Sequence, residues 1–163
     1  MKNHEAGRAN ARPAVFVEGG LGVPYDIRCR LEELRKLRSE QRRHAQLAED
    51  AMGRATVAMS TKRATDVGGT GNFPLTQYGP VYSKHRELSI EAGKKAEAIW
   101  MDVRRYVDAL GDFDTRMVVT GYYQNADSFE RVACMVKRSR ESVDRLHRNA
   151  LKSMERCDEA CRT

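Results

Sequence analysis

The sequence has few aromatic residues, few runs of β-branched residues and no long apolar segment. Aromatic residues make up 7% of the 163 residues, and the apolar share is 40%. This composition allows one modest core, and the abundance of Ala, Glu, Arg, Lys, Leu and Met favours helices over strands. No stretch approaches the roughly 18 apolar residues of a membrane span, and residues 1–13 lack the apolar segment of a signal peptide. We expect an all-α, cytoplasmic protein without membrane contact.

Residue patterns for metal binding and catalysis are also lacking. The four cysteines form no CxxC pair, and the four histidines are scattered without a Cys or carboxylate at ligand spacing. The sequence shows neither a carboxylate pair in an apolar setting nor a Ser or Cys nucleophile beside a histidine. It therefore predicts reduced thiols, no metal, no cofactor and no enzymatic activity.

Glycine and proline gather in two segments. The first, residues 1–24, contains Pro13, Gly19, Gly20, Gly22 and Pro24 and is predicted to be irregular. The second, residues 60–80, contains four glycines and two prolines and is predicted to be a flexible connector that interrupts the helices. Its GGTGNF stretch lacks both the Lys-Ser/Thr pair and the preceding apolar strand of a phosphate-binding loop.

Two long helices are predicted on either side of this connector. The first follows Asp26, a plausible N-cap, and carries a stripe with alternating spacings of four and three residues: Ile27, Leu31, Leu34, Arg38, Gln41, Ala45, Ala48, Met52, Ala55 and Met59. The second spans about Val81–Leu110, with an apolar stripe of its own. Because neither stripe can remain in water, residues 25–110 are predicted to form an antiparallel coiled-coil hairpin.

The last third of the chain has the pattern of shorter helices. Residues 114–124 are predicted to form one helix, Asp127 or Ser128 to cap the next, and Ser139 to cap a third from 140 to 157. Small Ala133 suits the close crossing of two helices. Residues 111–156 are therefore predicted to form a helix-turn-helix unit, followed by a tail at 157–163. The alternative is a plain three-helix bundle with a solvated charged face.

Charge favours the helix-turn-helix interpretation. The chain has a net charge of +6, and residues 131–156 hold eight Lys or Arg against three Asp or Glu, which suits a polyanionic partner. The predicted base-contacting residues are Arg140, Glu141, Asp144 and Arg145, and the predicted phosphate-contacting residues are Lys137, Arg138, Arg148 and Lys152. His147, on the same helix, is expected to pack or to contact a phosphate.

Residues 110–155 resemble region 4 of bacterial sigma factors, and more closely the phage-encoded RinA/ArpU-type transcriptional regulators. The matching features are the Tyr pair at 122 and 123, the step formed by Phe129, Val132 and Ala133, and the helix SRESVDRLHRNAL at 139–151. Phe129 stands where Trp is frequent, Val132 where Ile is usual, and Asp144 at an often basic position; the turn KRSRE lacks the customary Gly. The DNA sequence preference therefore cannot be inherited from the resemblance.

The resemblance implies a transcriptional regulator of late phage or prophage genes that binds double-stranded DNA in the host bacterial cytoplasm. We expect the helical hairpin to provide RNA polymerase contact or oligomerisation, with a homodimer as one arrangement, since two half-sites multiply specific affinity. One alternative is the small terminase subunit of a phage packaging machine, which also combines a helix-turn-helix with helical oligomerisation elements. Another is a structural coiled-coil adaptor that does not bind DNA.

Overall fold

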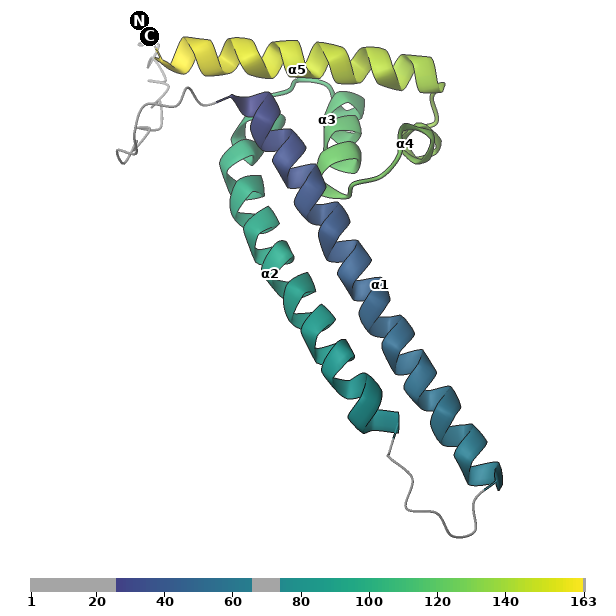
Figure 1. Ribbon diagram of the computed structural model, residues 1–163. Helices are drawn as coiled ribbons and strands as arrows, with labels where there is room; N and C mark the ends of the chain where they lie inside the picture. Colours follow the sequence, from purple (N-terminus) through teal and green to yellow (C-terminus); the bar gives the residue numbers. More distant parts are fainter. Residues whose placement is uncertain (1–25, 66–73, 163) are drawn as a thin grey trace, which may run out of the picture.

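The computed structural model describes residues 26–65 and 74–162, and within them there are helices and no strands (Figure 1). The all-α prediction is therefore confirmed for this part of the chain. The elements are α1 (Ile27–Thr65), α2 (Pro74–Asp108), α3 (Phe113–Val119), the π-helical turn η1 (Thr120–Gln124), α4 (Phe129–Val136) and α5 (Arg140–Arg162). The predicted irregular segment 1–24 and the Gly-rich part of the connector, 66–73, lie outside the described residues.

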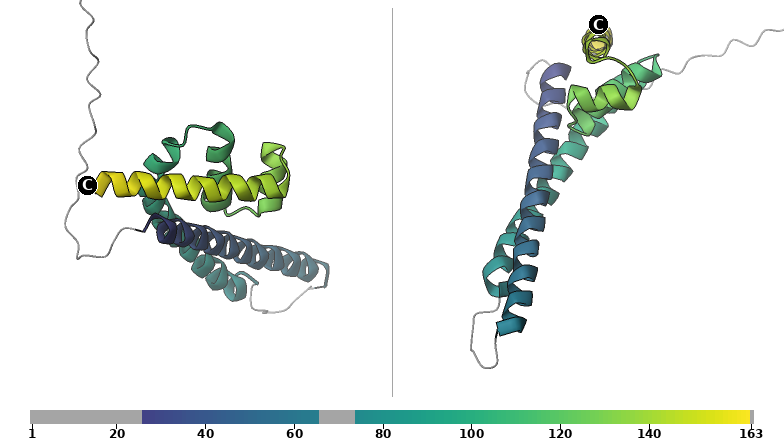
Figure 2. Two further views of the ribbon diagram at one scale, coloured as in Figure 1. Left: turned by 90° about the horizontal axis from the view of Figure 1, so that it is seen from above. Right: turned by 90° about the vertical axis from the view of Figure 1, so that its right-hand side faces the viewer.

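The two long helices lie side by side and run in opposite directions, while α5 lies across one end of the pair (Figures 1 and 2). As predicted, Asp26 caps α1: its carboxylate accepts hydrogen bonds from the backbone N–H of Arg28 at 2.9 Å and of Cys29 at 3.3 Å. The thiol of Cys29 also donates to Asp26 and, with these bonds, lowers the pKa of that carboxyl. None of the described helices could span a membrane.

The predicted connector 60–80 was too long. Helix α1 continues to Thr65, and α2 begins at Pro74, so that Gly79 and Pro80 lie inside the helix. Proline is well tolerated at the first position of a helix, where its missing N–H would have no partner in any case. Pro80 costs one backbone hydrogen bond in a helix of 35 residues, which the rest of the helix outweighs. At the other end, α5 extends to Arg162, so most of the predicted tail is helical.

Five members of the predicted stripe of α1 are buried, but the prediction is wrong at Met52; the buried members are Ile27, Leu31, Leu34, Ala48 and Ala55. Met52 is 39% exposed, and Ala51, which is 5% exposed, packs inward in its place. A straight helix has 3.6 residues per turn, so a strict seven-residue repeat drifts around its surface. In the middle of the stripe, Arg38 bonds across to Glu97 of α2 at 2.7 Å and to Gln41 at 3.0 Å.

Two groups of buried side chains hold the fold together. The larger joins the first turns of α1 to the last turns of α2 and to α5; its members are Ile27, Leu31, Leu34, Ala96, Ile99, Val103, Tyr106, Val107, Leu110, Val119, Tyr123, Ala150, Leu151 and Met154. The smaller lies among α3, α4 and the start of α5: Val118, Val132, Ala133 and Val143, with Phe129, Val136 and Leu146 at its edge. Helix α5 thus packs on the long helices with its later turns and on α4 with its first turns.

Candidate nucleic-acid interface

The chain reaches α4 through a capped helix and a π-helical turn. Asp112 caps α3 by accepting from the backbone N–H of Thr115 at 2.9 Å and from its hydroxyl at 2.7 Å, and these bonds lower the pKa of Asp112. The predicted single helix over 114–124 instead begins at Phe113 and widens into η1 at Thr120. The wider turn lets two consecutive tyrosines face the core: Tyr123 is fully buried, and Tyr122 stacks on Phe129 with ring centres 4.3 Å apart.

Of the two caps predicted for α4, Ser128 is the one observed. Its hydroxyl accepts from the backbone N–H of Arg131 at 3.3 Å. Asp127 is instead buried, where its carboxylate lies 3.5 Å from the guanidinium of Arg42 on α1 and 3.4 Å from that of Arg131. The break before α4 is therefore fastened to the long helices by an ion pair.

A three-residue turn, Lys137–Ser139, joins α4 to α5. Lys137 has φ of 53°, in the left-handed region that favours glycine, and its N–H bonds to the carbonyl of Cys134 at 3.3 Å. The N–H of Arg138 bonds to the carbonyl of Ala133 at 3.0 Å. As predicted, Ser139 caps α5, because its hydroxyl accepts from the backbone N–H of Ser142 at 3.3 Å. The turn thus fixes the direction in which α5 leaves α4.

The four predicted base-contacting residues lie together on the first turns of α5. Arg140, Glu141 and Arg145 are exposed, and Asp144 is half-buried. Two of the four form ion pairs: Arg140 with Glu130 of α4 at 3.2 Å, and Asp144 with Arg148 at 2.8 Å. Within the described part of the chain, Glu141 and Arg145 enter no ion pair.

The four predicted phosphate-contacting residues are all exposed, but two of them are paired. Arg138 donates to Asp114 of α3 at 2.6 Å, and Arg148 is paired with Asp144. Lys137 and Lys152 have no ion-pair partner among the residues that the structure describes. With Arg145, they are three exposed cations of α5 and its preceding turn that form no ion pair with a described residue.

His147 was expected either to pack or to contact a phosphate, and in the structure it faces inward. It is 9% exposed, and its Nε2 lies 2.9 Å from the hydroxyl of Tyr123. Burial lowers the pKa of His147 and raises the pKa of Tyr123. His147 is thus a packing residue that joins α5 to the core and is not placed to contact a phosphate.

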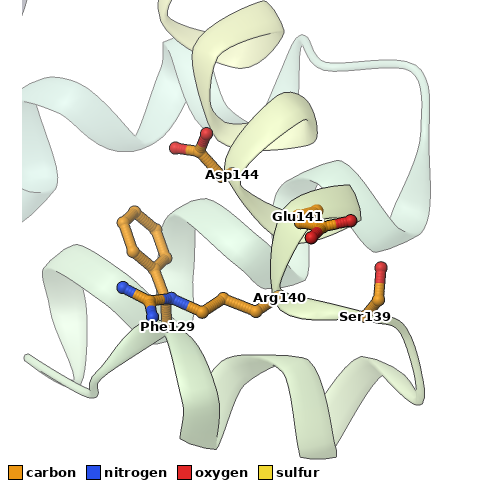
Figure 3. A pocket seen from close by; sticks show the side chains of 5 residues that line it. All are labelled: Phe129, Ser139, Arg140, Glu141 and Asp144. Atoms are coloured by element: carbon orange, nitrogen blue, oxygen red, sulfur yellow. The ribbon is translucent and has the colours of Figure 1, made fainter.

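Sequence reasoning missed a surface recess beside the predicted base-contacting residues. Its volume is about 560 Å³, and it is lined by Phe129, Ser139, Arg140, Glu141 and Asp144 (Figure 3). In the sequence, Phe129 stands out only as part of the step that resembles the RinA/ArpU-type regulators, and nothing in the sequence indicates a recess beside it. The recess arises because the Lys137–Ser139 turn folds α5 back so that its first residue reaches Glu130 of α4.

No family model, no curated protein and no solved structure matches this chain. Among the described residues, no group of three or more His, Cys, Asp or Glu side chains could hold a metal ion. Function therefore has to be inferred from the side chains that α5 exposes and from the way in which α4 and the long helices hold them.

Proposed function

We propose that this chain is a sequence-specific DNA-binding protein in which α4, the Lys137–Ser139 turn and α5 form a helix-turn-helix. In this proposal the first turns of α5 enter the major groove, where Arg pairs with guanine and a carboxylate accepts from the cytosine amino group. The observation that carries the proposal is the exposed polar side of α5, where Arg145 is exposed and forms no ion pair with any residue that the structure describes.

Electrostatics support a polyanionic partner for this side of α5. Lys137, Arg145 and Lys152 can contact DNA without first breaking an ion pair with a described residue, and each phosphate contact releases a condensed counterion. Arg140 and Arg148 form ion pairs whose side chains are largely exposed. Pairs of this kind contribute at most about 1 kcal/mol and can be exchanged for phosphate or base contacts.

As the resemblance of residues 110–155 to RinA/ArpU-type regulators implies, we further propose that the DNA lies near promoters of late phage or prophage genes. Binding there would raise or lower promoter occupancy in the host cytoplasm without covalent chemistry. The pair formed by α1 and α2, an antiparallel hairpin in this proposal, projects away from α5 (Figure 1). It would provide the contact with RNA polymerase or with a second copy of the chain.

Selection of bound sequences from a random pool of duplex DNA, followed by affinity titration, tests the proposal. We expect a defined sequence to emerge and its affinity to fall steeply with salt. Arg140→Ala or Arg145→Ala should cost about 1 to 3 kcal/mol and relax the sequence preference, whereas Lys152→Ala should weaken all duplexes alike.

The matched control is Arg104→Ala, which removes an exposed positive charge from α2, where Arg104 pairs with Asp108 at 3.4 Å. This variant should bind like the wild-type chain. If all four variants bound equally, or if binding did not depend on salt, α5 would not be the DNA-contacting element.

Genome packaging is the second candidate function. A small terminase subunit would also use a helix-turn-helix to bind DNA and long helices to oligomerise, and it would assemble as a ring. Several apolar side chains are exposed along the part of α1 and α2 remote from α5, namely Leu47, Met52, Val57 and Val81, which is consistent with further self-association. The mass in solution separates the candidates. A monomer or dimer supports regulation, and a ring of about eight or more subunits supports packaging.

A further inference from the structure

The recess lined by Phe129, Ser139, Arg140, Glu141 and Asp144 has an aromatic wall that is already held in place. The ring of Phe129 is stacked on Tyr122, 4.3 Å away and 9° from parallel, and meets His147 edge-on with ring centres 5.2 Å apart. Phe129 is only half-buried, so part of its ring remains open to the recess. A ligand that contacts it would not need to order the side chain first.

The charges around the recess disfavour a phosphate inside it. Two of its five lining residues are the carboxylates Glu141 and Asp144, and one is the cation Arg140 (Figure 3). Arg140 is already paired with Glu130. Phosphates are therefore attracted to Lys137 and Lys152 and not to the recess. Only an uncharged group of the DNA, such as the edge of a base, can enter this site without electrostatic cost.

In the major groove, the apolar group presented by a natural base pair is the 5-methyl of thymine, which phenylalanine can contact. We propose that the recess is a specificity pocket in which the Phe129 ring contacts the 5-methyl group of a thymine. This proposal rests on the proposed DNA-binding function and deepens it. It assigns Phe129, on α4, a role in sequence preference in addition to that of the residues of α5.

Replacing the thymines of the selected duplex one at a time with deoxyuridine tests the pocket directly, because this removes only the methyl group. We expect one thymine per bound α5 at which affinity falls about four-fold, the effect of withdrawing one methyl from an apolar contact. At that position, 5-methylcytosine paired with guanine should bind more tightly than cytosine paired with guanine. This second comparison needs no protein variant.

Phe129→Leu identifies the residue responsible, and Phe113→Leu is the matched control, since Phe113 is exposed at the start of α3 and does not line the recess. In Phe129→Leu the deoxyuridine penalty should shrink below about two-fold, whereas in Phe113→Leu it should remain. Tight binding with no deoxyuridine penalty at any position would overturn the pocket and leave the DNA-binding function intact. A penalty unchanged in Phe129→Leu would also overturn it, and a failure to select any duplex would overturn both proposals.

Discussion

The two ends of the α1–α2 pair are packed by different means. Near α5, large side chains such as Leu31, Leu34 and Val103 are fully buried. Away from α5, the buried residues of the pair are the alanines Ala48, Ala51, Ala55 and Ala92. There the helices are also joined by a half-buried hydrogen bond between the Nδ1 atoms of His44 and His85, 3.1 Å apart. We call these the near end (residues 27–41 and 96–108) and the far end (residues 44–59 and 78–92).

This difference shows which end of the pair is packed together with α5. The near end shares its core with α5, so the direction of α5 is set by the same side chains that join α1 to α2. The far end buries little apolar area per residue, because its buried side chains are alanines. The near end therefore holds the candidate interface in place, whereas the buried alanines of the far end belong to neither of the two core groups.

The largest expected effect comes from truncating a leucine at each end. Leu31→Ala should lower the free energy of unfolding by about 2 to 5 kcal/mol, because it leaves a cavity in the core shared with α5. Leu47→Ala, at the far end, removes a side chain that is 39% exposed and should cost less than about 1 kcal/mol. Urea unfolding followed by circular dichroism measures both. Equal losses would remove the distinction between the ends.

Two glycines sharpen the comparison further. A Cβ added at Gly121 would lie 3.0 Å from Cγ2 of Val132, so Gly121→Ala should destabilise the chain by about 1 to 3 kcal/mol through overpacking. A Cβ added at Gly53, inside α1, would meet no described atom within 4 Å apart from its chain neighbours and the backbone of its own helix, so Gly53→Ala should stabilise the helix by about 1 kcal/mol. Thermal unfolding should shift in opposite directions, and shifts of the same sign would contradict the packing described around η1.

The buried His147 should make the free energy of unfolding depend on pH. Its pKa is below the ordinary 6.5 because burial penalises the charged form, so the unfolded chain binds a proton more readily than the folded chain. The folded chain should therefore lose stability as pH falls below about 6.5, by at most about 1.4 kcal/mol per pH unit. His147→Gln should reduce this dependence of the unfolding free energy on pH. The measurement is made in a His44→Gln background, which removes the hydrogen bond between His44 and His85. An unchanged slope would show that other groups cause it.

The smallest expected effect compares two residues in the left-handed conformation. Lys137→Gly and Ala126→Gly should each raise the free energy of unfolding by about 1 kcal/mol, since both positions have φ near 50°. Only Lys137→Gly removes a predicted phosphate contact, so only this variant should also weaken DNA binding. Parallel denaturation and DNA titrations check the pair, and weaker binding by Ala126→Gly alone would place the contact elsewhere.

Local rules predicted much of the fold. The caps at Asp26 and Ser139, the inward positions of Leu31 and Leu34, and the outward position of Arg145 follow from capping chemistry and helical spacing. Pro80 and Met52 were misjudged because the tertiary setting outweighs local propensity and helical drift replaces one stripe residue by its neighbour.

The fine structure of the candidate interface could not be predicted from the sequence. The Arg140–Glu130 ion pair joins residues ten positions apart, and the recess beside Phe129 depends on the angle at which α5 leaves the turn. Both depend on the angle between α4 and α5. That angle is set at Lys137, which has a positive φ of 53°, a conformation in which glycine is customary. No spacing rule encodes that geometry.

Site-specific photo-crosslinking tests the central claim most directly. A photoreactive side chain at position 145 of α5, or at position 104 of α2, is exposed to the selected duplex at saturating protein concentration, and the crosslinked base is identified. The proposed interface predicts crosslinks to major-groove base positions from 145 and none from 104. Crosslinks from 104 alone, or from neither position while the duplex is bound, would show that α5 does not contact the bases.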